Sequence, residues 1–418
     1  MTTGPPPTDR AHLATAAEVV IALHLVVVAL TADLDAAGRV VVAVVVLAPL
    51  AVAAALRRSD RAGRRGVGMV LSGLVGTLAG AGVGPVHLAA VGPSPAAVLG
   101  VAALVCGLVL LVAGAVTAVR AVRGWRRLWA VPIALVVLQV LGPSVPVALY
   151  ATHVPIAHVE TTPPAGAQRV VVPAGDGVDL VAWYTPSRDG AAVLLRHGSG
   201  SASSKASTTR HAAVLADHGY GVLAMDARGH GESGGTAMDL GWHGDDDVAA
   251  GVAWLVGQPD VDADRIAGVG LSMGGEELIG ALPAVPGLRA VVAEGATGRT
   301  AADRRHLGFV GPQALVDRIV SAVTFGTADL LTRASSPTPL ADAIAALDGR
   351  SVLVIAGAPE PEVLTARHLH DLAPGDVEVW TVPAAGHIAA LQVDPDGWER
   401  TVIGFLDAAL VTPSASRP

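Results

Sequence analysis

The chain has 418 residues, 52% of them hydrophobic and 15% charged, with a formal net charge of −8. Residues 1–150 carry 11 Arg and no Lys against 5 acidic residues, whereas residues 151–418 carry 17 basic and 31 acidic residues. The acidic second part lacks the clustered basic face that nucleic-acid binding needs, which argues against a nucleic-acid partner. The only cysteine, Cys106, lies in an apolar run, which excludes an intrachain disulfide, a cysteine metal cluster and a thiol nucleophile.

Five apolar runs fill the first 150 residues, at about 13–32, 40–56, 67–92, 95–119 and 129–150. Most of them are near the ~20 residues that a helix needs to cross a hydrocarbon core of ~30 Å. The sequence therefore predicts a transmembrane helical domain over residues 1–150, with about five spans. No basic segment precedes the first run, so the N-terminus does not resemble a cleaved signal peptide.

Arginines gather in two short loops, RRSDRAGRR (57–65) and RAVRGWRR (120–127). Short loops rich in Arg stay in the cytoplasm, so the N-terminus is expected there and the last span leads out of the cell. We therefore expect an integral protein of a bacterial plasma membrane, with residues 151–418 on the extracytoplasmic side.

The third run carries a small residue at every fourth position, which makes a smooth strip on one helix face: Gly68, Ser72, Gly76, Gly80 and Gly84. Such strips allow helix backbones to approach closely. Packing within the chain is the favoured interpretation, and helix-helix self-association through the third span is the alternative. Glu18 and His24 interrupt the first run, and we interpret them as structural because no second acidic residue lies in the other four runs.

Residues 151–168 form a linker rich in Thr and Pro, after which short apolar runs alternate with helical patterns. Strands are expected near 169–173, 178–184, 191–196, 221–225, 265–271, 289–294, 351–356 and 377–382. Helices are expected near 205–218, 244–257, 273–283, 312–323, 362–372 and 396–410. This alternation predicts an α/β fold with a mostly parallel sheet covered on both faces, whose functional loops lie at the carboxyl ends of the strands.

Two segments match the pattern GxSxG, which chance makes easy in a chain with 49 glycines. GESGG (231–235) contains Ser233 but no helix opens at that serine, so we expect a loop. GLSMG (270–274) joins a strand directly to a helical pattern, which is the context that a nucleophile elbow requires. Ser272 would then lie at a helix N-terminus, whose dipole favours the negative charge of acyl transfer.

A serine nucleophile needs a base, and the loop WTVPAAGHIAAL supplies His387 after a late strand. Three other histidines compete but precede Ser272 in the chain: His197, His230 and His243. A carboxylate should follow the strand SVLVIAG, to orient the histidine and stabilise its cation. The turn APEPE offers two, of which Glu360 is favoured because it comes first, while Glu362 fits the acidic first turn of the next helix.

Two backbone N–H groups are expected to bind the oxyanion of the tetrahedral intermediate. One belongs to Met273, the residue after the nucleophile. The other belongs to Ser199 in the segment HGSG, where it follows Gly198 at the end of a strand.

In chain order, HGSG, DARGHGES, GLSMGG and the late GH resemble the motifs of α/β-hydrolases of the serine hydrolase type. Within that superfamily the chain is most similar to the dienelactone-hydrolase-like and peptidase-like group with membrane anchors. The resemblance implies an α/β-hydrolase domain over residues 169–412, with an eight-stranded sheet. Between the sixth and seventh strands lies a long insert, 297–350, whose apolar helical pattern PQALVDRIVSAVT is expected to form a cap over the site. The chain departs from the commonest pattern by offering Glu rather than Asp as the acid, and the multispan first part is not shared.

The expected function is a membrane-anchored serine hydrolase that cleaves an ester, thioester or amide through an acyl-enzyme, on a small-molecule or lipid acyl substrate. No cofactor and no metal are expected, because the acidic segment HGDDD (243–247) fits a helix start better than a metal site. Two alternatives stay open: an acyltransferase that uses the same three residues, and a non-catalytic ligand-binding or sensory membrane protein.

Overall fold

The computed structural model describes residues 7–155, 161–200, 203–307 and 311–410. The chain forms two compact units. After the expectations above, we call them the membrane unit, Met1–Val154 together with Leu315–Arg333, and the hydrolase unit, Pro155–Ala314 and Ala334–Pro418. A segment of the membrane unit, residues 315–333, is therefore inserted in the sequence of the hydrolase unit.

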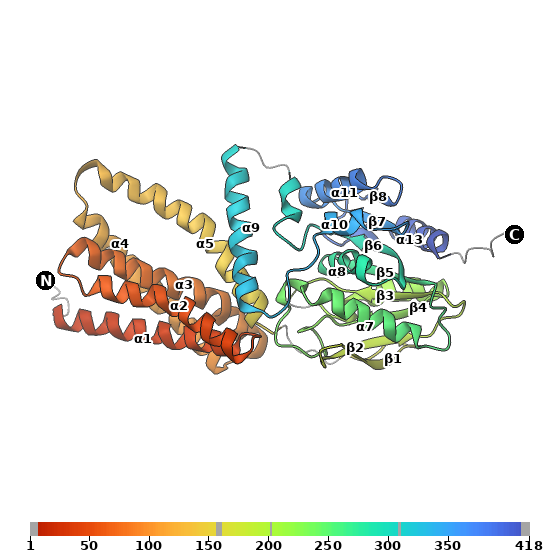
Figure 1. The fold of residues 1–418 in the computed structure, drawn as a ribbon, viewed down its shortest axis with the longest axis horizontal. Coiled ribbons are helices and arrows are strands. Elements are labelled where there is room, and N and C mark those ends of the chain that lie inside the picture. The colour runs from red at the N-terminus through yellow and green to blue at the C-terminus, as the bar shows by residue number, and fades with distance from the viewer. Residues whose placement is uncertain (1–6, 156–160, 201–202, 308–310, 411–418) are drawn as a thin grey trace. The chain divides into compact units, whose positions relative to one another are not determined.

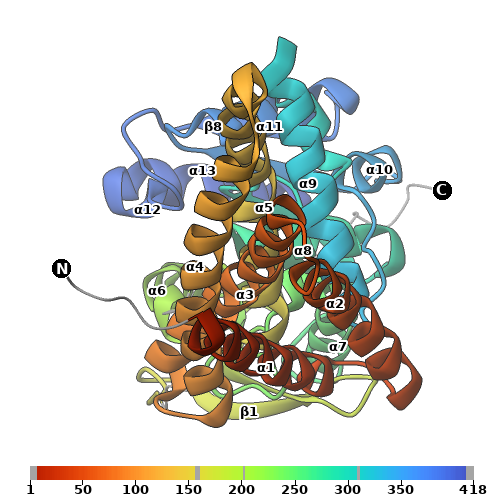
Figure 2. The same ribbon diagram turned by 90° about the vertical axis from the view of Figure 1, so that its left-hand side faces the viewer.

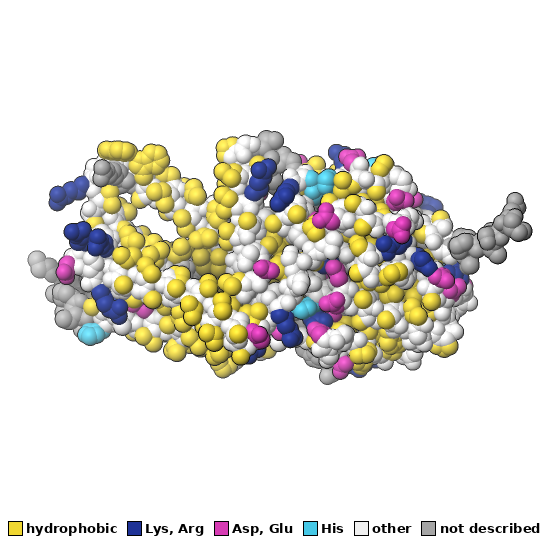
Figure 3. Space-filling view, in the orientation of Figure 1, with side chains coloured by type: hydrophobic (Ala, Val, Ile, Leu, Met, Phe, Trp, Pro, Cys, Tyr) yellow, Lys and Arg dark blue, Asp and Glu magenta, His cyan; other side chains and the backbone are white. Residues whose placement is uncertain are grey.

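Five helices of the membrane unit are long and apolar enough to cross a membrane, as the sequence predicted. Their bounds are α1 Pro7–Thr31, α2 Ala36–Arg57, α3 Ala62–Val91, α4 Pro95–Ala121 and α5 Ala130–His153. Hydrophobic side chains cover much of the visible surface of these helices (Figure 3). A surface of this kind is suited to lipid rather than to water.

Helices α3 and α4 are packed backbone to backbone. A Cβ atom placed on Gly80 would lie 2.4 Å from the backbone N of Leu104, and one on Gly73 would lie 2.3 Å from that of Leu111. All five residues of the predicted strip are buried inside the unit. The strip therefore packs within the chain, and self-association through these five residues is not supported.

Glu18 joins three helices of the membrane unit. Arg57 of α2 donates two hydrogen bonds to its carboxylate, at 2.9 and 2.8 Å, and the Ser72 hydroxyl of α3 donates a third at 3.0 Å. A buried carboxylate with a cation and a further donor is well satisfied. These contacts fit the structural interpretation of Glu18.

The hydrolase unit is built on one eight-stranded sheet, with the order β1-β2-β4-β3-β5-β6-β7-β8. The strands are β1 Gln168–Pro173, β2 Asp179–Thr185, β3 Ala192–Arg196, β4 Gly221–Met225, β5 Ile266–Leu271, β6 Leu288–Glu294, β7 Ser351–Ala356 and β8 Val377–Thr381. Strand β2 runs antiparallel to its neighbours β1 and β4, and the remaining pairs are parallel. The predicted mostly parallel sheet is confirmed.

Helices cover both faces of the sheet, and each face has its own apolar core. On one face lie α7 Gly244–Val256, α8 Met273–Ala281, α10 Leu340–Ala345 and α11 Glu360–Leu372. On the other lie α6 Thr209–Asp217, α12 Ala390–Val393 and α13 Pro395–Ala409. Figure 2 shows α6, α12 and α13 on one side of the unit, and α7 and α10 on the other. The short helices α10 and α12 were not predicted.

Helix α9 (Gly311–Leu331) is longer than the predicted 312–323, and most of it belongs to the membrane unit. The Ser144 hydroxyl of α5 donates to the Val320 carbonyl at 3.2 Å, and Arg333 Nε donates to the Asp33 carboxylate at 3.1 Å. Figure 1 shows α9 crossing the direction of α1 to α4 at a steep angle. Whether residues 297–350 act as a cap stays a prediction.

Candidate active site

Ser272 lies at the sharp turn between β5 and α8, with φ +52° and ψ −120°. A non-glycine residue with positive φ is uncommon, and such strain is concentrated at functional sites. The Ser272 N–H donates to the Glu294 carbonyl of β6 at 2.7 Å, which holds the turn against the sheet. The predicted strand-turn-helix context of Ser272 is present.

Two glycines allow this turn. A Cβ on Gly270 would lie 2.4 Å from the backbone of Gly274, and one on Gly274 would lie 2.6 Å from the His197 carbonyl. Both distances are shorter than any ordinary contact, so side chains at these positions would push the helix off the strand. The two glycines of GLSMG are therefore required by the turn, and the match to GxSxG is not a matter of chance.

His387 follows β8 and reaches Ser272, 115 positions away in sequence. Its Nε2 lies 3.0 Å from the Ser272 Oγ, and its Nδ1 lies 2.7 Å from the Glu362 Oε1. In that network Nδ1–H donates to the carboxylate and Nε2 accepts from the hydroxyl. The structure thus brings together the predicted serine and histidine at the carboxyl edge of the sheet.

The carboxylate that contacts His387 is that of Glu362, which corrects the preference for Glu360. Glu362 is buried, and its second oxygen accepts the Gly357 N–H at 2.9 Å. Glu360 is the exposed first residue of α11. Residues two positions apart point to nearly opposite sides of a helix, so only one of the two can face the sheet.

A periodic signal in the sequence could have found Glu362. It begins the buried face of α11, which continues through Thr365, Ala366 and Leu369 at the spacings expected of a helix. Glu360 is outside that pattern. Distance from the end of the strand was the wrong criterion, because the helix already starts at Glu360.

The hydrogen bond to Glu362 raises the pKa of His387, against an opposing effect of burial. The carboxylates of Glu276 and Glu294 add to the increase. A raised pKa makes the imidazole a stronger base and stabilises its cation once it has taken a proton. The side chain is 48% exposed, so it lies at the surface of the unit.

The HGSG loop lies beside Ser272, since a Cβ on Gly198 would be 3.1 Å from the Ser272 Cβ. His197 Nε2 accepts the Ala227 N–H at 2.9 Å, which leaves the proton on Nδ1 to donate to the Gly198 carbonyl at 2.8 Å. Burial lowers the pKa of His197 well below its usual value, so the ring is neutral. In a trans peptide the N–H points opposite to the carbonyl, so His197 turns the Ser199 N–H away from itself.

Other candidate residues have structural contacts. Ser233 accepts the Val181 N–H at 2.8 Å and donates to the Asp226 carbonyl at 3.0 Å, in a loop as predicted. The His230 ring lies beside that of His197, with ring centroids 5.0 Å apart and the planes tilted by 60°, and His230 is 1% exposed. Neither side chain is part of the Ser272 and His387 network described above.

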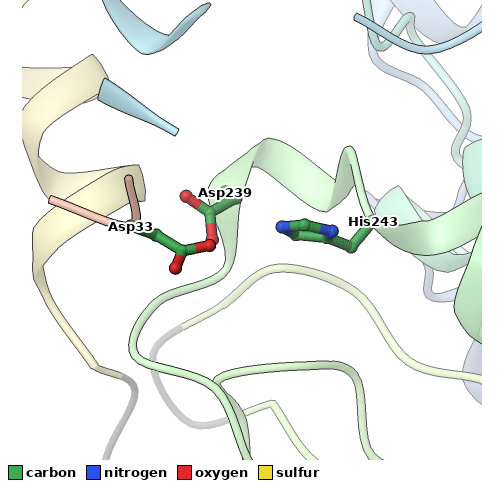
Figure 4. A group of neighbouring side chains, drawn as sticks. All are labelled: Asp33, Asp239 and His243. Carbon is green, nitrogen blue, oxygen red and sulfur yellow. The ribbon is translucent and has the colours of Figure 1, made fainter. Parts of the chain in front are cut away.

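The acidic segment 243–247 opens α7. Asp245 accepts from Arg299 at 2.6 Å, and Asp247 accepts from Arg228 at 2.7 Å. Figure 4 draws His243, the residue before α7, with Asp239 from the preceding turn; Asp33, also labelled there, belongs to the membrane unit. Two carboxylates of HGDDD are therefore engaged with arginines, which fits the interpretation of this segment as a helix start.

Comparison with known proteins gives one family-model match and a few partial relatives. Residues 175–360 match the family model of the X-Pro dipeptidyl-peptidases (S15 family). An uncharacterized protein of Mycobacterium tuberculosis is 36% identical over 129 residues, which is 30% of this chain and 44% of that protein. An uncharacterized protein of Salmonella typhimurium is 28% identical over 140 residues, 32% of this chain and 47% of that protein. The chain thus spans less than half the length of these curated relatives.

Solved structures of two hydrolases are similar to part of this chain. An esterase of Pyrococcus furiosus is 22% identical, covers 61% of this chain and 100% of its own, and has a TM-score of 0.48. A dienelactone hydrolase of Anabaena variabilis is 18% identical, covers 59% of this chain and 100% of its own, and has a TM-score of 0.41.

Proposed function

We propose that the hydrolase unit is an α/β-hydrolase and that the chain is a membrane-anchored serine hydrolase, which the S15 family match over residues 175–360 and the mostly parallel eight-stranded sheet support. The observation that carries the proposal is the 3.0 Å contact between Ser272 Oγ and His387 Nε2. A hydroxyl is a weak nucleophile until a base within hydrogen-bonding reach removes its proton. His387 lies at that distance, and its raised pKa suits the task.

The reaction proceeds in two halves. Ser272 Oγ attacks the acyl carbon of an ester, thioester or amide while its proton passes to His387, and the imidazolium then protonates the leaving group. Water next attacks the acyl-enzyme by the same route in reverse and releases the acid. Glu362 holds the tautomer and stabilises the imidazolium, through the 2.7 Å bond to Nδ1.

Backbone N–H groups of Met273 and Ser199 hold the negative oxygen of the tetrahedral intermediates. Met273 opens α8, so its N–H is among those that lack a partner within the helix. Ser199 is supported by the hydrogen bond of His197 to the Gly198 carbonyl. Donors fixed in advance are worth about 10²–10³ in rate each.

We place the hydrolase unit outside the cytoplasm, following the two arginine-rich loops. Contacts within the membrane unit support this topology. The His153 ring at the end of α5 bonds the Val28 carbonyl near the end of α1 at 2.9 Å, and Arg333 bonds Asp33 just beyond α1. The segments that lead into the hydrolase unit therefore leave the bundle at the end opposite the two arginine-rich loops, 57–65 and 120–127.

The proposed substrates carry apolar acyl groups. Helix α9 lies across the membrane helices and exposes Leu315 and Ile319, at 60% and 40% of their surfaces. A helix that lies crosswise with exposed apolar side chains is suited to the membrane interface. Because α9 is inserted in the sequence between β6 and β7, the hydrolase unit is connected to the membrane unit from within its own sheet.

Labelling with a fluorophosphonate tests the nucleophile. Membranes that contain the full-length protein should be labelled, and Ser272→Ala should abolish labelling. Ser233→Ala, the serine of the other GxSxG match, should retain it. Labelling that persists in Ser272→Ala would overturn the assignment, and absence of labelling in the wild type would favour a ligand-binding protein.

A panel of acyl esters tests the substrate class. Long-chain lipid esters in native membranes should be turned over faster than short soluble esters, and equal turnover would contradict the apolar class. A labelled enzyme that releases acid only when an alcohol or amine is absent, and otherwise forms the acylated acceptor, would be an acyltransferase.

A further inference from the structure

Glu294 is a buried carboxylate next to the site that the proposed mechanism does not use. It ends β6 and is only 3% exposed. One carboxylate oxygen accepts the Ala390 N–H at 2.8 Å, and the other accepts the Trp398 Nε1–H at 3.2 Å. Burial raises the pKa of this carboxylate, and the two donors, one on each oxygen, oppose that rise because they favour the ionised form. Both donors belong to the segment that follows His387.

That segment begins with a strained residue. Ile388, directly after His387, has φ +50°. A β-branched side chain in this region is an outlier that persists only where its surroundings fix it. The bond from Glu294 to the Ala390 N–H anchors the chain two residues beyond Ile388.

The backbone around Glu294 contacts both members of the nucleophile-base pair. Its carbonyl accepts the Ser272 N–H at 2.7 Å. The next residue, Gly295, has φ +75°, and a Cβ there would lie 3.0 Å from the His387 Cε1. Ser272 and His387 are thus both held against the end of β6.

We propose that Glu294 is a positioning residue: its carbonyl holds the Ser272 turn and its carboxylate holds the His387 loop, so that one residue sets the distance between the two. This inference rests on the proposed function. Its carboxylate oxygens bond Ala390 and Trp398, so Glu294 acts through the loop and does not replace Glu362 as the partner of His387.

Glu294 also contributes charge. Three carboxylates from three elements favour the protonated form of His387: Glu362 of α11, Glu276 of α8 and Glu294 of β6. Removal of one negative charge lowers the pKa of His387. Because the neutral imidazole is the base, the acidic limb of the rate profile then moves to lower pH.

The experiment measures the rate constant of fluorophosphonate labelling against pH, on the full-length protein in membranes. Glu294→Gln should lower the plateau rate by about 10–100-fold, since small misplacements at a site have effects of this size. Its acidic midpoint should shift to lower pH. Glu360→Gln is the matched control, because it removes an exposed carboxylate from the start of α11 and should change neither quantity.

A second variant separates positioning from packing. In Glu294→Gln the amide oxygen can accept one donor, but the NH₂ group then faces the other. Trp398→Phe removes one of the two donors, so the amide in the double variant can accept from Ala390 without a clash. We expect the double variant to label faster than Glu294→Gln alone.

Three results would overturn the inference: a Glu294→Gln rate within twofold of wild type, an unshifted midpoint, or losses that simply add in the double variant. If Glu294→Gln does not fold, Trp398→Phe decides: a several-fold slower rate with an unchanged midpoint supports the inference, and an unchanged rate contradicts it. Failure of the proposed function looks different, because the wild type would then not label at all.

Discussion

In the membrane unit, α3 and α4 approach until backbone meets backbone, whereas in the hydrolase unit α8 is fastened to β3 by a buried ion pair. A Cβ on Gly80 would lie 2.4 Å from the Leu104 N, and Arg196 Nη2 lies 2.5 Å from Glu277 Oε2. Arg196 and Glu277 are both almost fully buried. The two units thus solve the problem of holding a helix in place by different means.

The difference follows from the surroundings. Lipid tails are as apolar as the side chains of a membrane helix, so helices there associate through close packing of small residues. In the hydrolase unit the sheet already supplies an apolar core. Buried ion pairs there fix the distance and orientation of the groups they join, which apolar contacts do not. Such charges gather at the carboxyl edge, next to Ser272. One added methyl group between α3 and α4 should therefore lower the stability of the membrane unit, and the loss of one buried charge near Ser272 should lower the activity of the site.

The largest expected effect is the loss of charge at Glu362. Glu362→Gln keeps the shape but places an amide against His387 Nδ1, which favours the wrong tautomer. We expect kcat/KM to fall by about 10⁴, which corresponds to about 5.5 kcal/mol. Ester hydrolysis and the fluorophosphonate labelling rate both measure it.

Glu360→Gln is the control for that change, since it alters a carboxylate two residues earlier on the exposed side of α11. Its activity should be within twofold of wild type. A loss of activity in Glu360→Gln as large as that in Glu362→Gln would contradict the assignment of Glu362 as the partner of His387.

A smaller effect is expected from one methyl group in the membrane unit. Gly80→Ala should lower the free energy of unfolding by about 1–3 kcal/mol, because overpacking forces the two helices apart. Thermal unfolding in detergent measures it, and the labelling rate of Ser272 at low temperature should be unchanged.

Gly63→Ala provides the comparison on the same helix, because a Cβ there has its nearest neighbour at 3.6 Å. It should be neutral or slightly stabilising, since Ala favours a helix more than Gly does. If both variants unfold at the wild-type temperature, close backbone contact is not what holds α3 to α4.

The smallest effect concerns pH. His387 must be neutral to accept the Ser272 proton, and Glu362 raises its pKa above the usual 6.5. The labelling rate should therefore be high above that pKa and should fall as pH drops through it, by about tenfold per unit, or about 1.4 kcal/mol. A midpoint below 6.5 would contradict the contact with Glu362.

Most of the fold could be predicted because it rests on local patterns. Eight apolar runs gave the eight strands, and the strand-turn-helix context separated Ser272 from Ser233. His387 was found because its place after a late strand brings it to the same sheet edge. These inferences need only periodicity and the geometry of parallel sheets.

The errors arose where three-dimensional contacts decide which residue faces the site or which elements pack together. Glu360 and Glu362 differ only in which side of α11 they face, and the start of that helix was placed at 362 instead of 360. The sequence of α9 has the pattern of an ordinary amphipathic helix, and nothing in residues 311–331 predicts which helices it packs against. Its partner α5, and the connection after α1 that Arg333 contacts just beyond α9, lie far away in sequence.

The excursion of α9 gives the chain three covalent crossings between its units, after Val154, before Leu315 and after Arg333. A protease that cuts only after Val154 would leave the hydrolase unit joined to the membrane unit through residues 315–333. In the proposed orientation, treatment of intact cells with such a protease should therefore fail to release the hydrolase unit, and a soluble version would have to replace residues 315–333 as well as omit the first 154.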